Sequence, residues 1–164
     1  MAKLTPQQQA EIQELLPSLV AWAEQMETKA LSEGTPLSDV LKNMATILGI
    51  KAIDSVKIYS VDTIPKPDNP RIVQLAAAFG LSFTDSTGMT FGHAIFVRRS
   101  HVQDVYLLTH ELVHVRQYEW AGSIGLYLQE YVKQLIDFQY QNMPFESEAV
   151  SETYRLLGHP RTYR

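Results

Sequence analysis

The sequence has no cysteine, no long apolar run and no long run of lysine and arginine. Without cysteine there is no disulfide framework and no thiolate nucleophile, so any metal site must use histidine, aspartate or glutamate. No apolar stretch approaches the roughly 20 residues that span a bilayer, and the N-terminus lacks the apolar core of a signal peptide. We therefore expect a cytoplasmic protein with no membrane partner.

The charge balance is mildly acidic, with 14 Lys+Arg against 18 Asp+Glu and a formal net charge of -4. A general nucleic-acid binder gains most of its affinity by neutralising phosphates, so no nucleic-acid partner is expected. The length of 164 residues fits one domain, and a chain of this size buries about 70% of its unfolded surface on folding. We expect a single domain, 1–164, and leave its oligomeric state open.

The hydrophobic pattern predicts helices on both sides of two β segments. Residues 6–31 have the spacing of an amphipathic helix, in which Pro17 predicts a kink or a junction of two helices. Ser38 and Gly49 are typical of the caps of a second helix, and β-branched residues at 56–61 predict a strand. The other expected elements are a short helix, a second strand and three C-terminal helices, over 71–79, 90–97, 102–120, 124–140 and beyond Pro144. These elements predict an α+β fold with an N-terminal helical layer.

His110, Glu111 and His114 form the pattern H-E-x-x-H within the predicted helix 102–120. Positions i and i+4 share one helix face, so both imidazoles can point at one cation, and Glu111 can reach a water bound to it. Two neutral imidazoles can hold Zn²⁺, which lowers the pKa of a bound water towards ~7, while the glutamate takes the proton. The alternative is a core helix whose polar side chains are all hydrogen-bonded.

The third metal ligand must come from further along the chain, where Glu146 and Glu148 lie in the first turns of the helix after Pro144. Two residues apart on a helix, they face nearly opposite ways. The face of Glu146 continues through small and apolar residues, whereas that of Glu148 continues through Glu152 and Arg155. We therefore predict Glu146 as the ligand and Glu148 as a solvated residue that pairs with Arg155 or lies near Glu152. On the alternative interpretation, both only favour the helix N-terminus electrostatically.

With these residues in place, the sequence resembles the gluzincin-type zinc metallopeptidases, in which a later glutamate, often within E-x-x-A, completes H-E-x-x-H. Glu146 and Ala149 match that register. Val150 departs from it, because such families often carry an acidic or amide residue there. An alignment with the E-A-x-S-D stretch of thermolysin-like enzymes would instead make Glu148 the ligand. The resemblance implies a metal site of His110, His114 and a glutamate.

A longer resemblance covers somewhat over a third of the chain, through the segments TFGHAIFVRR, LLTHELVHVRQYEWAGSI and PFESEA. It is to bacterial proteins described only as metallopeptidases of unassigned substrate or as domains of unknown function. It implies a zincin-like fold and a metal. In zincins the strand before the metal helix forms the sheet edge over the cleft, and a peptide substrate adds to it as another strand. Residues 91–97 occupy that position.

Two further aspects of the site remain open from the sequence. The oxyanion donor that such peptidases use is not distinguished among four side chains, namely Tyr118, Tyr140, Tyr154 and His159. His93 is interpreted as a surface or packing residue of its strand, with a site role as the lesser alternative.

The leading functional hypothesis is a zinc-dependent hydrolase, a metallopeptidase acting on a peptide or protein substrate, with Glu111 as general base. The alternative is an inactive binding or scaffold protein that keeps the fold. We expect residues 51–164 to form the catalytic core and the helical segment 1–50 to pack on it. A third hypothesis gives that segment an inhibitory role, covering the cleft.

Overall fold

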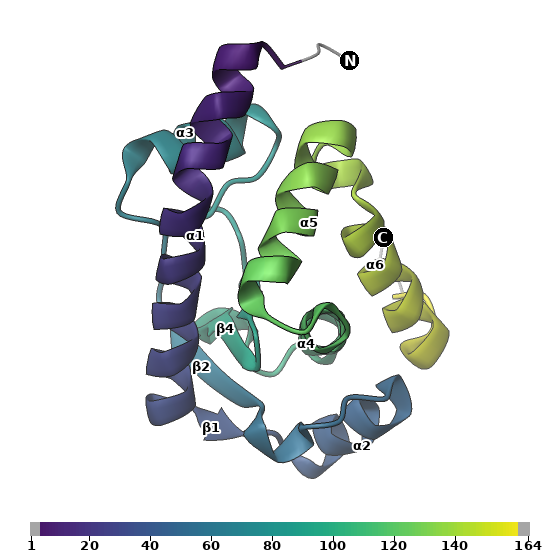
Figure 1. Cartoon of the computed structure of the whole chain (residues 1–164). Helices are drawn as coiled ribbons and strands as arrows, with labels where there is room; N and C mark the ends of the chain where they lie inside the picture. Colours follow the sequence, from purple (N-terminus) through teal and green to yellow (C-terminus); the bar gives the residue numbers. More distant parts are fainter. Residues whose placement is uncertain (1–3, 161–164) are drawn as a thin grey trace.

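The computed structural model describes residues 4–160, which form an α+β fold (Figure 1). The α-helices are α1 (Pro6–Glu33), α2 (Asp39–Leu48), α3 (Pro70–Ala78), α4 (Val105–Ala121), α5 (Ile124–Phe138) and α6 (Pro144–Leu157). The strands are β1 (Thr35–Pro36), β2 (Lys57–Val61), β3 (Gly88–Phe91) and β4 (Ala94–Arg98). Short 3-10 turns occupy Ile53–Ser55, Arg99–His101 and Tyr140–Asn142. The predicted α+β class is confirmed.

The strands form one mixed sheet in the order β1-β2-β4-β3, in which β2 and β4 are parallel and the other pairs antiparallel. The central strand β4 is buried on both faces. Ala94 and Phe96 belong to the core cluster that contains α1 and α5, while Ile95 and Val97 belong to the cluster beneath α2 and α4. α1 therefore covers one face of the sheet, and α2 and α4 cover the other (Figure 1).

Helix α1 runs without interruption past Pro17, so the predicted junction of two helices is wrong. Proline cannot donate the hydrogen bond that the carbonyl of Gln13 would otherwise receive. Both residues are exposed, so water can hydrate that carbonyl. The helix begins with a capping box, in which Thr5 and Gln8 each accept a hydrogen bond from the other's main-chain N–H.

The predicted strand over 90–97 is wrong in its extent, because the segment folds as a β-hairpin. β3 and β4 pair from Gly88↔Val97 to Phe91↔Ala94, with Gly92 and His93 as a two-residue loop. Gly92 has φ +62°, which suits the first loop position of a type II′ turn. The edge of the sheet next to α4 is therefore β3 rather than the predicted 91–97, because β4 lies inside the sheet.

The N-terminal segment shares its core with the rest of the chain. The Trp22 ring packs edge-on against Phe83 and Phe91, with centroid distances of 5.8 and 5.0 Å. Residues 35–36, which lie between the two predicted helices of this segment, form β1 and pair with β2. The segment is thus built into the fold on both sides of the sheet. Within residues 4–160, no helix combines the length and the apolar character needed to cross a membrane.

Candidate metal centre

Helix α4 carries the H-E-x-x-H residues in a buried position. Asp104 caps its N-terminus by accepting a hydrogen bond from the N–H of Leu107, and Gly122 ends it with φ +95°. Glu111 and His114 are 4% and 6% exposed, and His110 is partly exposed. One possible ligand atom from each of the three residues lies within 4.8 Å of the others, a grouping that can hold a metal ion.

The carboxylate of Glu146 on α6 completes this cluster. Its Oε2 lies 3.0 Å from Nε2 of His110, and its Oε1 lies 3.3 Å from Nε2 of His114. The two imidazole nitrogens are 3.2 Å apart. Ligand atoms bound tetrahedrally to a metal ion at about 2.0–2.1 Å lie about 3.3 Å from one another, a separation similar to those found here.

The electrostatics of the cluster are dominated by this carboxylate and its two imidazoles. Burial alone would lower the pKa of His114, but the charge and hydrogen bond of Glu146 raise it to about 9. Burial likewise opposes ionisation of Glu146, yet His114 and His110 hold the pKa of its carboxyl well below the usual range. A cation in the centre would take over the role of the proton held between these groups.

Helix α6 is oriented so that Glu146 faces α4. Pro144 stands in the first turn, and the side-chain oxygen of Gln134 on α5 accepts a hydrogen bond from the N–H of Phe145 at 2.9 Å. The same face continues through Ala149 and Thr153, which are buried as the inward-face argument predicts, whereas Val150, expected on that face as well, is exposed. The structure therefore brings Glu146 to the two histidines.

Glu148 lies near Glu152, as predicted, but it is only partly exposed and its cationic partner is Arg116 rather than Arg155. Its carboxylate accepts a hydrogen bond from Arg116 of α4 at 2.6 Å and one from Gln117 at 3.4 Å. Arg116 also pairs with Glu152, one turn further along α6, at 3.0 Å. Glu148 thus belongs to an ion-pair network that fastens α6 to α4 and contacts neither histidine of the motif.

Gln117 fixes the orientation of the His114 ring. Its amide nitrogen donates to the carbonyl of Phe145 at 3.0 Å and towards Glu148, so its oxygen must face the ring. That oxygen lies 2.8 Å from Nδ1 of His114, which therefore carries a proton. With Nδ1 as the donor, the neutral ring presents the lone pair of Nε2 to the centre of the cluster.

Thr90 of the edge strand β3 positions Glu111. Its hydroxyl donates to Oε2 of Glu111 at 2.6 Å, which leaves Oε1 free of that bond. A Cβ added to Gly88 of the same strand would lie 3.1 Å from Oε1, a close approach that glycine permits. β3 therefore fixes Oε2 of Glu111 through the hydroxyl of Thr90 and leaves space beside Oε1 because Gly88 has no side chain.

The four predicted candidates for an oxyanion donor are separated in the structure. The hydroxyl of Tyr118 is committed to the carbonyl of Thr90 at 3.2 Å. Tyr154 and His159 pack ring to ring at one end of α6. Tyr140 alone among the four lines both cavities that adjoin the centre.

His93 lies outside the metal centre, in the hairpin loop. Its Nε2 is 2.8 Å from a carboxylate oxygen of Glu119, at the C-terminal end of α4. Glu119 also accepts hydrogen bonds from the N–H groups of Lys51 and Ala52 at 2.7 and 3.0 Å. This cluster joins the hairpin, α4 and the loop before β2, so the packing interpretation of His93 fits its contacts.

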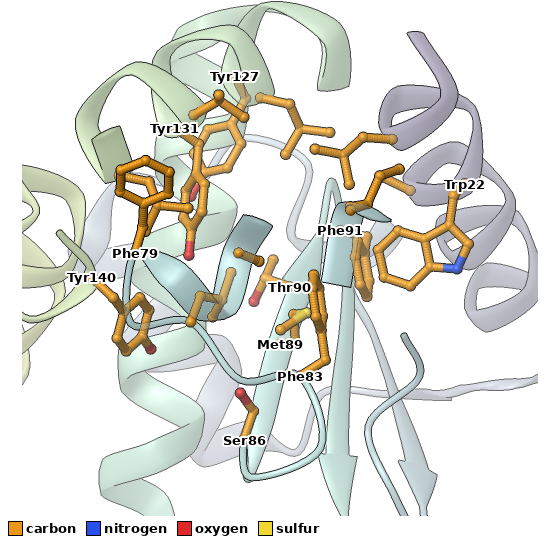
Figure 2. A pocket seen from close by; sticks show the side chains of 18 of the residues that line it. Trp22, Phe79, Phe83, Ser86, Met89, Thr90, Phe91, Tyr127, Tyr131 and Tyr140 are labelled. Atoms are coloured by element: carbon orange, nitrogen blue, oxygen red, sulfur yellow. The ribbon is translucent and has the colours of Figure 1, made fainter. Parts of the chain in front are cut away.

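Two cavities meet at Glu111. The apolar chamber, of about 140 Å³, lies between α1, α3, α5 and β3, and His114 and Glu146 also line it. The polar cavity, of about 750 Å³, lies on the other side, where Asp85, Asp104 and Thr153 contribute to its wall. Figure 2 shows the chamber with Trp22 and Phe91 on one side and Tyr131 on the other.

No protein-family model, curated protein or solved structure matches this chain. What the site can do is therefore inferred from its own residues. Sequence reasoning missed two of them, Thr90 and Gln117. Gln117 stands three residues after His114, on the same helix face, which was the one available signal. The contact of Thr90 with Glu111 spans 21 positions, and no local pattern predicts it.

Proposed function

We propose that the protein is a zinc-dependent hydrolase that cleaves peptide bonds, with a zincin-like active site. The observation that carries the proposal is the convergence of two imidazole nitrogens and the two oxygens of one carboxylate, at distances of 3.0–3.3 Å, next to a buried glutamate at the junction of two cavities. A core helix with satisfied polar groups needs neither this convergence nor the adjoining space.

The donor set suits zinc, since two imidazoles and one carboxylate leave a fourth position open, as catalytic zinc sites do. His110, His114 and Glu146 would hold the ion, which when bound supplies Lewis-acid activation of water and of a carbonyl. Glu111 accepts the proton of the attacking water and delivers it to the leaving amine. Thr90 holds the carboxylate of Glu111 in place for both transfers.

The edge strand β3 offers a place for a peptide backbone. The N–H of Arg98 donates to the carbonyl of Thr87, so the alternation of an antiparallel pair turns the peptide groups of Gly88 and Thr90 outward. The carbonyl of Thr90 is taken by Tyr118. The outward groups of Gly88 remain beside Glu111, where an extended substrate can pair with them.

Tyr140 is the best-placed donor for the oxyanion. It lines both cavities, and its main-chain N–H is anchored to the carbonyl of Phe79 at 2.9 Å. Gln139, just before it, has φ +62° and ψ 158°, a region that residues other than glycine rarely adopt. Such strain tends to occur at functional sites. Tyr140 would donate a hydrogen bond to the charge that develops on the carbonyl oxygen.

The test compares the wild-type protein with Glu111→Gln, using zinc-loaded protein and a library of fluorogenic peptides. Loss of the general base should lower kcat by about 10²- to 10⁴-fold, while zinc content stays unchanged. Glu119→Gln, on the same helix but in the other cluster, is the matched control and should keep its activity. Equal cleavage by wild type and Glu111→Gln, or none by either, would refute a peptidase and favour a binding protein.

A further inference from the structure

The apolar chamber is lined mainly by apolar side chains, which offer water few hydrogen-bond partners. Among the described residues that line it, the ionisable groups other than tyrosines are Glu111, His114 and Glu146, all of which belong to the metal centre. The rest of the wall is mainly aliphatic and aromatic, with Leu16 and Leu128 as members from α1 and α5. A charged group placed there would lose its hydration without gaining a partner.

The size of the chamber indicates what fills it. An engineered apolar cavity of about 150 Å³ in another protein stays dry and binds benzene. The chamber, at about 140 Å³, is close to this volume. One aromatic ring or one branched aliphatic side chain would therefore fill it, and a smaller group would leave part of its wall without contacts.

The chamber opens directly onto the reacting groups, because Glu111 and Glu146 are part of its wall. On the opposite side, Glu111 borders the polar cavity, whose volume of about 750 Å³ can accept extended chain with polar side chains. A substrate spanning both spaces has an apolar group on one side of the metal centre and polar chain on the other.

We infer that the chamber is the specificity pocket of the enzyme, and that the substrate is a peptide with a leucine-sized or phenylalanine-sized residue adjoining the bond that is cleaved. This inference rests on the proposed function and adds to it the class of substrate. It also gives helix α1 a role, because Leu16 and Trp22 of that helix form part of the pocket that receives the substrate side chain.

The experiment uses peptides identical except at one central position, which carries Leu, Phe, Ala, Asp or Lys. Each missing methylene in an apolar pocket costs about 10- to 200-fold in kcat/KM. The Leu and Phe peptides should therefore be cleaved at least about 100-fold more efficiently than the Ala peptide, with Asp and Lys lower still. Cleavage of all five at similar rates, or a preference for the charged residues, would overturn the inference and leave the peptidase proposal intact.

Two variants locate the preference in the chamber. Leu128→Ala enlarges it and should shift the ratio of Phe to Leu cleavage upward by about 10-fold or more. Leu126→Ala, two residues away on the exposed side of α5, is the matched control and should leave the ratio unchanged. If both variants give the wild-type ratio, the specificity pocket lies elsewhere.

A binding measurement tests the chamber without any catalysis. Benzene is titrated into the wild-type protein and into Leu128→Trp, in which the larger ring occupies the chamber, and methyl resonances are followed by NMR. Saturable shifts in the wild type that disappear in Leu128→Trp support the part of the inference that concerns the chamber, namely that it receives an apolar group, whether or not a peptide is cleaved. Absence of saturable binding to the folded wild type overturns it.

Discussion

Both halves of helix α4 carry buried polar side chains, but the surroundings of these side chains differ. In the C-terminal half, Arg116 is held between Glu148 and Glu152, and Glu119 is bonded to His93 and to two main-chain N–H groups. In this half, the guanidinium of Arg116 is therefore paired with carboxylates, and the carboxylate of Glu119 with hydrogen-bond donors. In the N-terminal half, two imidazoles and the carboxylate of Glu146 converge on one point beside two cavities.

This difference separates a structural network from a functional one on the same element. Buried polar groups in a network that serves stability are paired with one another and closed to ligands. Groups that bind a ligand face a common space, and the ligand itself is their partner. We therefore expect substitutions of Arg116 and its partners to lower the free energy of unfolding while metal binding persists. Substitutions around His114 should weaken metal binding while the free energy of unfolding stays close to that of the wild type.

The largest effect is expected for Arg116→Ala. Removing the arginine leaves Glu148 facing α4 without its cation and Glu152 with Arg155 alone. We expect a cost of about 3 kcal/mol of unfolding free energy, because truncating one member of a buried ion pair typically costs about 3–5 kcal/mol and these carboxylates are partly exposed. Urea denaturation of the zinc-loaded protein measures it. Zinc stoichiometry should stay that of the wild type. An unchanged urea midpoint would show that the network does not stabilise the fold.

A smaller effect is expected for Gln117→Leu, because the side chain of Gln117 contacts both His114 and Glu148. The variant removes the acceptor that keeps a proton on Nδ1 of His114, and loss of such support typically weakens metal affinity 10- to 100-fold. Competition with a chelator measures the affinity. Gln129→Leu, an exposed glutamine on α5, is the control. Equal affinities in the two variants would show that Gln117 does not orient the metal ligand.

The smallest effect concerns pH. A hydrogen bond from Arg155 holds the pKa of Glu152 at about 2, aided by Arg116 and opposed by burial, against an ordinary value of 4.5. Because the folded state lowers this pKa, the stabilisation is present above about pH 4.5 and is lost as pH falls towards 2. Glu152→Gln should therefore flatten the fall in stability between pH 5 and 3. Denaturation curves of both proteins at these pH values test this, and parallel curves would contradict it.

Elements whose ends carry local chemistry were predictable from the sequence. Helix α2 lies between Ser38 and Gly49, and α3 follows the Asn69 cap, as their residue types predict. The hairpin of β3 and β4 was missed because its loop consists of only two residues, Gly92 and His93, within an otherwise apolar run. Only pairing with a neighbouring strand reveals that glycine as a turn.

In the site, too, features set by local helix geometry could be predicted, whereas contacts between distant parts of the sequence could not. The positions of His110 and His114 follow from helix geometry alone, and the inward face of α6 selected Glu146 over Glu148. The partner of Glu148 was missed, because Arg116 lies 32 positions earlier and approaches from another helix. The apolar chamber also escaped prediction, since its walls come from helices and a strand that are distant in sequence.

The most direct test of the metal centre is a zinc titration of wild type, Glu146→Gln and Glu148→Gln, with X-ray absorption at the zinc edge on the loaded proteins. We expect one zinc per wild-type chain, bound by nitrogen and oxygen atoms that include two imidazoles. We expect the same for Glu148→Gln and a loss of affinity for Glu146→Gln. A wild type that binds no stoichiometric zinc, or a Glu146→Gln variant that binds zinc as tightly as the wild type, would refute the proposed metal centre.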